Sequence, residues 1–105
     1  MRWQVRGMKM KKEEILSVLR QYKRDHADQY GIIDLGIFGS VARGEYSTSS
    51  DIDLCVRTEH PDPFSLVHIK ADIESILNIP VDIIRLRESM NPHLRARIDK
   101  EVLYV

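Results

Sequence analysis

Two extended runs with a very short connection constrain the fold of this chain more than any other feature. Residues 32–38 are apolar and β-branched, and residues 51–57 alternate polar with apolar side chains, so both runs indicate strands. The connection begins with Gly39-Ser40, which end the first strand and open a short helical turn with Ser40 as its N-cap. A crossover between parallel strands takes about a dozen residues or more, so we expect these two strands to be antiparallel.

Two predicted helices flank these strands. Apolar and aromatic side chains recur at three- and four-residue steps up to Tyr30, which indicates one buried helix face, and Gly31 ends the helix. Asp62-Pro63 is an N-cap followed by proline at the first helical position, so a second helix begins there and ends at Asn78. Its predicted buried stripe consists of Leu66, Ile69, Ile73 and Ile76.

A third strand and a last helix complete the predicted domain. The strand runs from Pro80 to Leu86, and Asn91-Pro92 begins a helix that turns Leu94 and Ile98 inward. Residues 102–105 suit a short edge strand or a helical tail, and as an edge strand they could pair with a second copy of the chain. The predicted fold class is α/β of the α+β type, a small mixed β-sheet backed by helices.

Length and charge limit the functions that this chain can have. Its 105 residues suit a single domain, which we place at residues 13–105. Residues 1–12 are basic and lack the apolar core of a secretory signal, so we expect a flexible tail there. With 16 Lys plus Arg and 16 Asp plus Glu the net charge is zero, and no global field favours nucleic acid or membrane.

The single cysteine and the lack of a long apolar run favour a cytoplasmic location. Cys55 has no partner for an internal disulfide, so a reducing compartment is the simpler assumption, and we expect Cys55 to be a small core residue. No run approaches the roughly 20 apolar residues of a membrane span. The basic residues near the C-terminus form either a solvated face or a docking surface: Arg85, Arg87, Arg95, Arg97 and Lys100.

Three acidic residues fall where divalent cations could bind. Asp51 and Asp53 are two apart on a strand, so they project from one face, where like charges repel unless a cation neutralises them. Asp82 is an acid inside an apolar strand, and beside the first two it would complete a ligand set for two metal ions. Mg²⁺ suits carboxylates combined with phosphates. Alternatively, Asp51 caps a turn and Asp82 protects an edge strand.

The turn after the first strand has the composition of a phosphate-binding turn. Gly39 lets the backbone approach a ligand, Ser40 adds a hydroxyl, and N–H groups at a helix start attract anions. Arg43 lies one turn further and can bind a terminal phosphate, while Gly44 can leave the helix with positive φ. Gly-Ser is common in ordinary turns, so it is the spacing to the two following acids that makes the pattern specific.

The chain resembles the DNA-polymerase-β-like nucleotidyltransferase superfamily, and above all the minimal nucleotidyltransferases of prokaryotes. The resemblance covers residues 13–105 and lies in Gly39-Ser40-Val41-Ala42-Arg43-Gly44 followed by Ser50-Asp51-Ile52-Asp53-Leu54. It implies that Asp51, Asp53 and Asp82 are the catalytic carboxylates and bind two Mg²⁺ ions. It also implies that the triphosphate of ATP, the family's default nucleotide, is held by Gly39, Ser40 and Arg43.

The same resemblance implies a reaction and a partner. An acceptor hydroxyl attacks the α-phosphorus of ATP, AMP is transferred and pyrophosphate leaves. Minimal nucleotidyltransferases are commonly paired with HEPN-domain toxins and act as antitoxins by binding the toxin and by adding AMP to a tyrosine on it. A chain of this length has no room for an acceptor-binding domain, which agrees with an acceptor on another protein. Two alternatives stay open: an antitoxin that neutralises by contact alone, and transfer to a small molecule or an RNA end.

Overall fold

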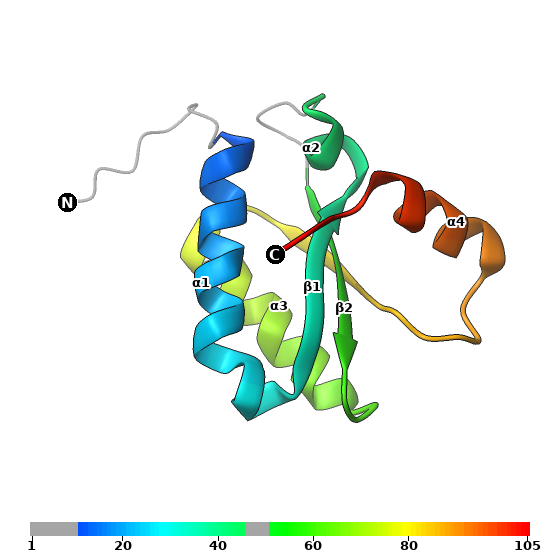
Figure 1. Cartoon of the computed structure of the whole chain (residues 1–105). Helices are drawn as coiled ribbons and strands as arrows, with labels where there is room; N and C mark the ends of the chain where they lie inside the picture. Colours follow the sequence, from blue (N-terminus) through cyan, green and yellow to red (C-terminus); the bar gives the residue numbers. More distant parts are fainter. Residues whose placement is uncertain (1–10, 46–50) are drawn as a thin grey trace.

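The structure, a computed structural model, describes residues 11–45 and 51–105 (Figure 1). Most of the predicted tail at 1–12 lies outside these residues, although the first helix already begins at Lys12. The elements follow one another as α1 (Lys12–Tyr30), β1 (Ile32–Phe38), α2 (Gly39–Arg43), β2 (Ile52–Thr58), α3 (Pro63–Leu77), β3 (Val81–Arg85), α4 (Pro92–Glu101) and β4 (Leu103–Tyr104).

The four strands form one mixed sheet in the order β3-β2-β1-β4. β1 and β2 are antiparallel, as the short connection between them predicts. β2 and β3 are parallel, because α3 carries the chain back across the sheet between them. Residues 102–105 contain a short edge strand rather than a helical tail, since β4 pairs antiparallel with β1 through Gly36 and Tyr104. The predicted α/β fold is therefore confirmed.

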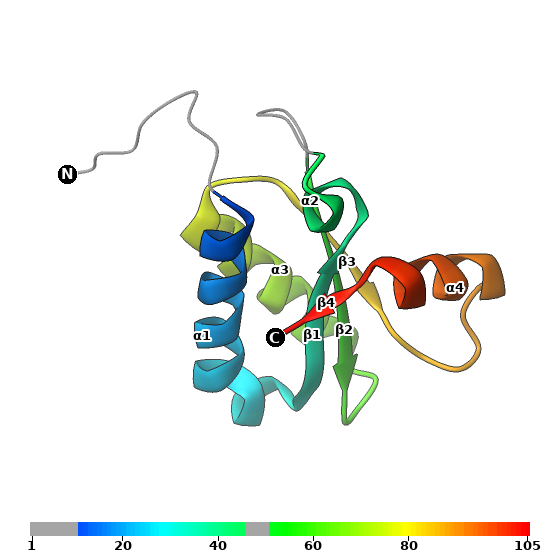
Figure 2. The ribbon, with the colours of Figure 1, turned by 45° about the horizontal axis from the view of Figure 1, so that its top comes forward.

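Helices cover both faces of the sheet, so the protein has three layers (Figures 1 and 2). One face packs against α1 and α3 and holds the larger core, built around Ile15, Leu19, Leu35, Ile37, Ile52, Leu54, Val56, Ile69 and Ile73. The other face packs against α4 around a smaller cluster of Phe38, Cys55, Leu86 and Ile98. Successive residues of β2 alternate between the two cores, which leaves Asp53 and Cys55 on the α4 face.

Residues at the helix ends explain where the helices start and stop. Gly31, Gly44 and Asn78 all have positive φ at the C-caps of α1, α2 and α3, a conformation that glycine and asparagine tolerate best. Asp62 and Asn91 accept hydrogen bonds from the first backbone N–H groups of α3 and α4. Within the described ranges, the helices include none that is long and apolar enough to cross a membrane.

Two details of the predicted helices are wrong. Ser40 is not the N-cap of α2, because the helix already begins at Gly39 and its N-cap is Phe38. Ile76 does not belong to the buried stripe of α3: its side chain is 54% exposed, and Leu77 takes the inward position. The inward residues of α3 follow four-residue steps from Ser65 through Ile69 and Ile73, so the next inward position is 77.

Candidate active site

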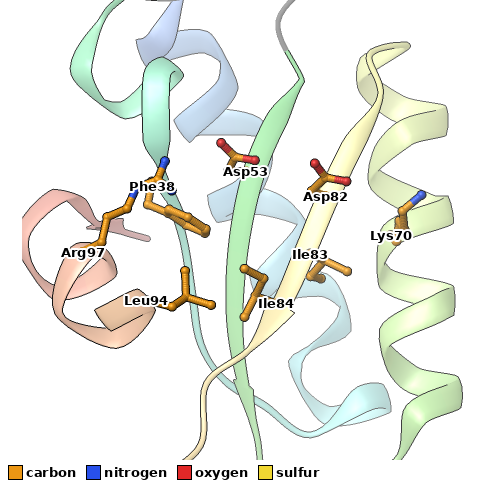
Figure 3. A pocket seen from close by; sticks show the side chains of 8 residues that line it. All are labelled: Phe38, Asp53, Lys70, Asp82, Ile83, Ile84, Leu94 and Arg97. Atoms are coloured by element: carbon orange, nitrogen blue, oxygen red, sulfur yellow. The ribbon is translucent and has the colours of Figure 1, made fainter. Parts of the chain in front are cut away.

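Two of the predicted carboxylates lie side by side on the α4 face of the sheet. Asp53 and Asp82 are direct partners in the parallel pairing of β2 with β3. In register, such partners point to the same side of a sheet, about 4.8 Å apart at the backbone. Figure 3 shows both side chains at the same level on neighbouring strands. β3 is also an edge strand, so its position agrees both with a metal-binding Asp82 and with an acid that protects the edge of the sheet from pairing with other chains.

Asp51, the third predicted carboxylate, immediately precedes β2 and is exposed. Its charge is close enough to Asp53 to raise the pKa of that carboxyl. Within residues 11–45 and 51–105, however, no three His, Cys, Asp or Glu side chains already converge closely enough to hold a metal ion. The structure therefore pairs Asp53 with Asp82 and leaves Asp51 at the margin of this pair.

The paired carboxylates line a pocket of about 510 Å³ whose other lining residues come from the sheet, from α3 and from α4 (Figure 3). Phe38, Ile84 and Leu94 give it an apolar wall, while Lys70 of α3 and Arg97 of α4 stand on opposite sides of the acids. The Arg97 guanidinium also lies over the Phe38 ring, 5.7 Å from its centroid. The pocket thus combines a negative centre with two flanking cations and an apolar surface.

The charge of Asp53 is disfavoured in this pocket. Burial is the largest effect that raises the pKa of Asp53 above its usual value, and the neighbouring charge of Asp82 adds to it. Arg97 and Arg43 act in the opposite direction without cancelling the shift. A cation bound between the carboxylates would remove this repulsion, so the donor set fits a hard divalent ion such as Mg²⁺.

The predicted phosphate turn lies directly beside Asp53. Gly39 has a φ of 78°, and a Cβ there would lie 3.2 Å from the Asp53 carboxyl carbon and closer still to its Oδ2. Only glycine can therefore fit at this position next to the acid. Gly44 ends α2 with positive φ, as predicted. The turn and the carboxylates, which the sequence separates by several residues, thus form one continuous site.

A residue that the sequence analysis did not single out closes this turn. Glu101, the last residue of α4, accepts the Gly39 N–H at 3.0 Å through Oε1 and an Arg43 N–H at 2.8 Å through Oε2. Arg43 also donates to Glu45 at 3.1 Å. Glu101 lies far along the chain from both donors and has no motif of its own, so only the return of α4 over the end of β1 reveals the contact.

Two other side chains that could carry chemistry, those of Cys55 and His26, are packed among neighbouring side chains outside the pocket. Cys55 is fully buried, and burial raises the pKa of its thiol to about 11, which confirms its prediction as a core residue. His26 stacks between the rings of Tyr22 and Tyr30 on α1. Among the basic C-terminal residues, Arg97 is the one that lines the pocket.

Comparison with known proteins identifies the same chemistry. The family described as "Nucleotidyltransferase domain" matches residues 13–105. Protein adenylyltransferase MntA of Thermococcus cleftensis is 31% identical over 94 residues, which are 89% of this chain and 94% of that protein. A solved structure of a "putative minimal nucleotidyltransferase" is 32% identical, with a TM-score of 0.75 over 92% of this chain and 98% of the other.

A more distant structure shares the fold. It is a chain from the complex of a tri-AMPylated HEPN toxin of Shewanella oneidensis with its MNT antitoxin, 19% identical, with a TM-score of 0.66 over 89% of this chain and 70% of that chain. The family match covers nearly all of the described residues, and the mixed sheet with its helices agrees with the fold of the similar solved structure. The chain therefore belongs to the nucleotidyltransferase domain family and is a nucleotidyltransferase.

Proposed function

We propose that this protein transfers AMP from Mg²⁺-ATP to a tyrosine hydroxyl of a HEPN-type toxin and thereby acts as its antitoxin. The observation that carries the proposal is the in-register pair of Asp53 and Asp82 beside the Gly39 turn, in one pocket. The name of the Thermococcus relative, a protein adenylyltransferase, supports the transfer of AMP to a protein. The AMPylated toxin in the Shewanella complex supports a HEPN partner.

The metal would be held by the carboxylates at the N-terminal ends of β2 and β3. Asp53 and Asp82 supply neighbouring oxygens, and Asp51, whose charge acts on Asp53, would join them if a cation drew the three acids together. Mg²⁺ bound there would neutralise the triphosphate and make its α-phosphorus more electrophilic. The raised pKa of Asp53, caused by burial and by Asp82, supports this assignment because a cation is the simplest relief for that repulsion.

The protein's own groups then position the reactants. Gly39, Ser40 and Arg43 hold the β- and γ-phosphates at the start of α2, where backbone N–H groups and the guanidinium neutralise negative charge. The acceptor oxygen forms a bond to the α-phosphorus as the bond to the pyrophosphate oxygen breaks, and Asp82 accepts the hydroxyl proton. Such a reaction depends mainly on positioning and on charge stabilisation.

The apolar wall of the pocket favours an aromatic acceptor. Phe38, Ile84 and Leu94 lie beside the carboxylates, so a tyrosine ring could pack against them while its hydroxyl reaches the acids. A ribose hydroxyl at an RNA end would place a polar sugar against the same surface. The pocket therefore supports a tyrosine more than a nucleic-acid acceptor.

Incubation with ATP, Mg²⁺ and the HEPN-domain product of a neighbouring gene tests the proposal. Mass spectrometry should find AMP on a tyrosine of the partner, and Asp51→Asn, Asp53→Asn or Asp82→Asn should reduce transfer at least a hundredfold. Asp34→Asn is the matched control, because Asp34 is a strand acid paired with Arg57 outside the pocket. This control should transfer AMP at the wild-type rate.

Each alternative has its own outcome in this experiment. Tight binding of the partner without any AMP on it would identify an antitoxin that acts by contact alone. Full activity of Asp82→Asn would show that Asp82 only protects the edge strand β3 and takes no part in the transfer. Labelling of RNA or of a small molecule, but not of the partner, would overturn the protein acceptor.

A further inference from the structure

An acidic side chain of the protein itself occupies the donors that we assign to the triphosphate. The Glu101 carboxylate accepts the Gly39 N–H at 3.0 Å and an Arg43 N–H at 2.8 Å, one oxygen for each donor. Its side chain is only 17% exposed, so this carboxylate is part of the turn and not a passing surface contact. Arg97 forms an ion pair with the same carboxylate at 3.6 Å, so two hydrogen-bond donors and a further cation surround one anion.

The fold holds Glu101 at this position. It is the last residue of α4, and the chain continues directly into β4, which pairs with β1 through Leu103 and Tyr104. Gly36 of β1 approaches Val102 so closely that a Cβ there would lie 2.8 Å from the Val102 side chain. The backbone on the C-terminal side of Glu101 is therefore fixed, and only rotation of the side chain can move the carboxylate away from the turn.

The carboxylate is charged at neutral pH. Burial acts to raise the pKa of Glu101, but the Gly39 N–H and the Arg43 guanidinium outweigh it and hold the pKa below its usual value. A carboxylate and a phosphate oxygen are both anionic acceptors for the same donors. The single N–H of Gly39 cannot donate fully to both, so a bound triphosphate and Glu101 exclude each other at this atom.

We infer that Glu101 is an internal competitor of the nucleotide's triphosphate: it accepts hydrogen bonds from the Gly39 and Arg43 N–H groups, and polyphosphate binding displaces it. The inference rests on the proposed function, since it concerns the turn that we assign to the β- and γ-phosphates. It implies that Glu101 weakens nucleotide affinity and also neutralises Arg43 when the site is empty. A nucleotide without the terminal phosphates should not compete with Glu101.

Calorimetric titration of wild-type protein and Glu101→Gln with AMP-PNP and with AMP, both with Mg²⁺, tests the inference. Gln keeps the shape of the side chain and removes its charge. The dissociation constant for AMP-PNP should fall roughly three- to tenfold, the factor expected when a partly screened charge-assisted contact no longer competes. The dissociation constant for AMP should stay unchanged, because AMP lacks the phosphates that need these donors.

Asp99→Asn is the matched control. Asp99 is an acid of the same helix, 56% exposed and paired with Arg95 at 3.0 Å, so its loss changes the net charge equally without touching the turn. This variant should bind both nucleotides like the wild type. An equal gain in Asp99→Asn would show a general charge effect and overturn the competition.

The remaining outcomes are also decisive. Weaker AMP-PNP binding by Glu101→Gln would show that Glu101 positions Arg43 for the nucleotide, and unchanged binding would show that the two anions do not compete; either result overturns the inference. If Glu101→Gln melts at a temperature close to that of the wild type, weaker AMP-PNP binding by this variant cannot be caused by unfolding. If the wild type itself binds no AMP-PNP, the proposed function fails first, and the inference fails with it.

Discussion

At Asp53, the proposed catalytic role and the stability of the fold oppose each other. Burial, followed by the charge of Asp82, raises the pKa of Asp53 in the folded protein above its unfolded value. The folded state therefore binds the Asp53 proton more tightly than the unfolded state does. By linkage, the resulting stability is fully present below the unfolded pKa, near 4, and is lost as the pH rises through the folded pKa. At neutral pH the ionised Asp53 thus costs stability.

We predict that Asp53→Asn melts a few degrees above the wild type at pH 7 without Mg²⁺. The amide keeps the shape of the side chain and removes the repulsion from Asp82, so the free energy of unfolding increases. At pH 4 the difference between the two proteins should shrink, because the raised pKa leaves a larger fraction of Asp53 protonated there than at pH 7. Thermal melts at both pH values measure the difference in melting temperature. The control Asp34→Asn loses an ion pair with Arg57 and should not melt above the wild type. A less stable Asp53→Asn at pH 7 would contradict this account of the site.

Individual residues of the site differ in how well the sequence predicts them. Asp53 and Gly39 follow from local pattern, because strand periodicity and turn chemistry depend on near neighbours. The pairing of Asp82 with Asp53 required the further assumption that β3 lies beside β2, which the register confirms. Glu101 could not be predicted, since no local rule links the end of α4 to a turn at the end of β1.

At the scale of elements, α4 links the smaller core to the site. Ile98 and Leu94 pack its inner side against Phe38 and Cys55, while Arg97 and Glu101 extend toward the pocket and the turn. Local sequence signals define the start of this helix well, because Asn91 accepts hydrogen bonds from the backbone N–H groups of His93 and Leu94 at 2.8 and 3.2 Å. The position of α4 over the sheet depends on long-range packing and was not evident from sequence.

We predict that Asn91→Ala lowers the free energy of unfolding by about 1 kcal/mol, the usual cost of losing an N-cap. Asn91→Asp should retain most of the stability, because its carboxylate can accept the same two hydrogen bonds at a helix N-terminus. Urea unfolding of both variants and the wild type measures the difference. Equal destabilisation by Asp and Ala would show that the amide nitrogen, and not the accepting oxygen, matters at this position.

Details of the predicted elements were wrong or left open where neighbouring elements decide the outcome. Ser40 is a favoured N-cap in general, but β1 runs directly into α2, so the helix begins at Gly39. Ile76 fits a three-residue helical step, but the packing of α3 against the sheet follows four-residue steps to Leu77. Residues 102–105 had two possible states, and only pairing with β1 selects a strand. For Ile76 and for residues 102–105, a contact distant in sequence decided between the local options.

For the molecule as a whole, the two faces of the sheet have different roles. The larger core on the α1 and α3 face supplies most of the buried apolar surface, while the other face carries the paired acids beside the smaller core. The sequence alone predicted this mixed sheet and its antiparallel first pair, because the short connection allowed little else. It could not predict which face α4 covers, and that face determines the shape of the pocket.

This division of roles predicts that ligand reverses the order of stability between the wild type and Asp53→Asn. Without ligand, the variant should melt higher. With Mg²⁺ and AMP-PNP at about 100 times the dissociation constant, the wild type gains about 2.7 kcal/mol, which for a domain of this size corresponds to roughly 10 °C or more. Asp53→Asn should gain far less, because the cation loses a charged ligand. Asp34→Asn should gain as much as the wild type, and equal gains in all three proteins would place the nucleotide elsewhere than beside Asp53.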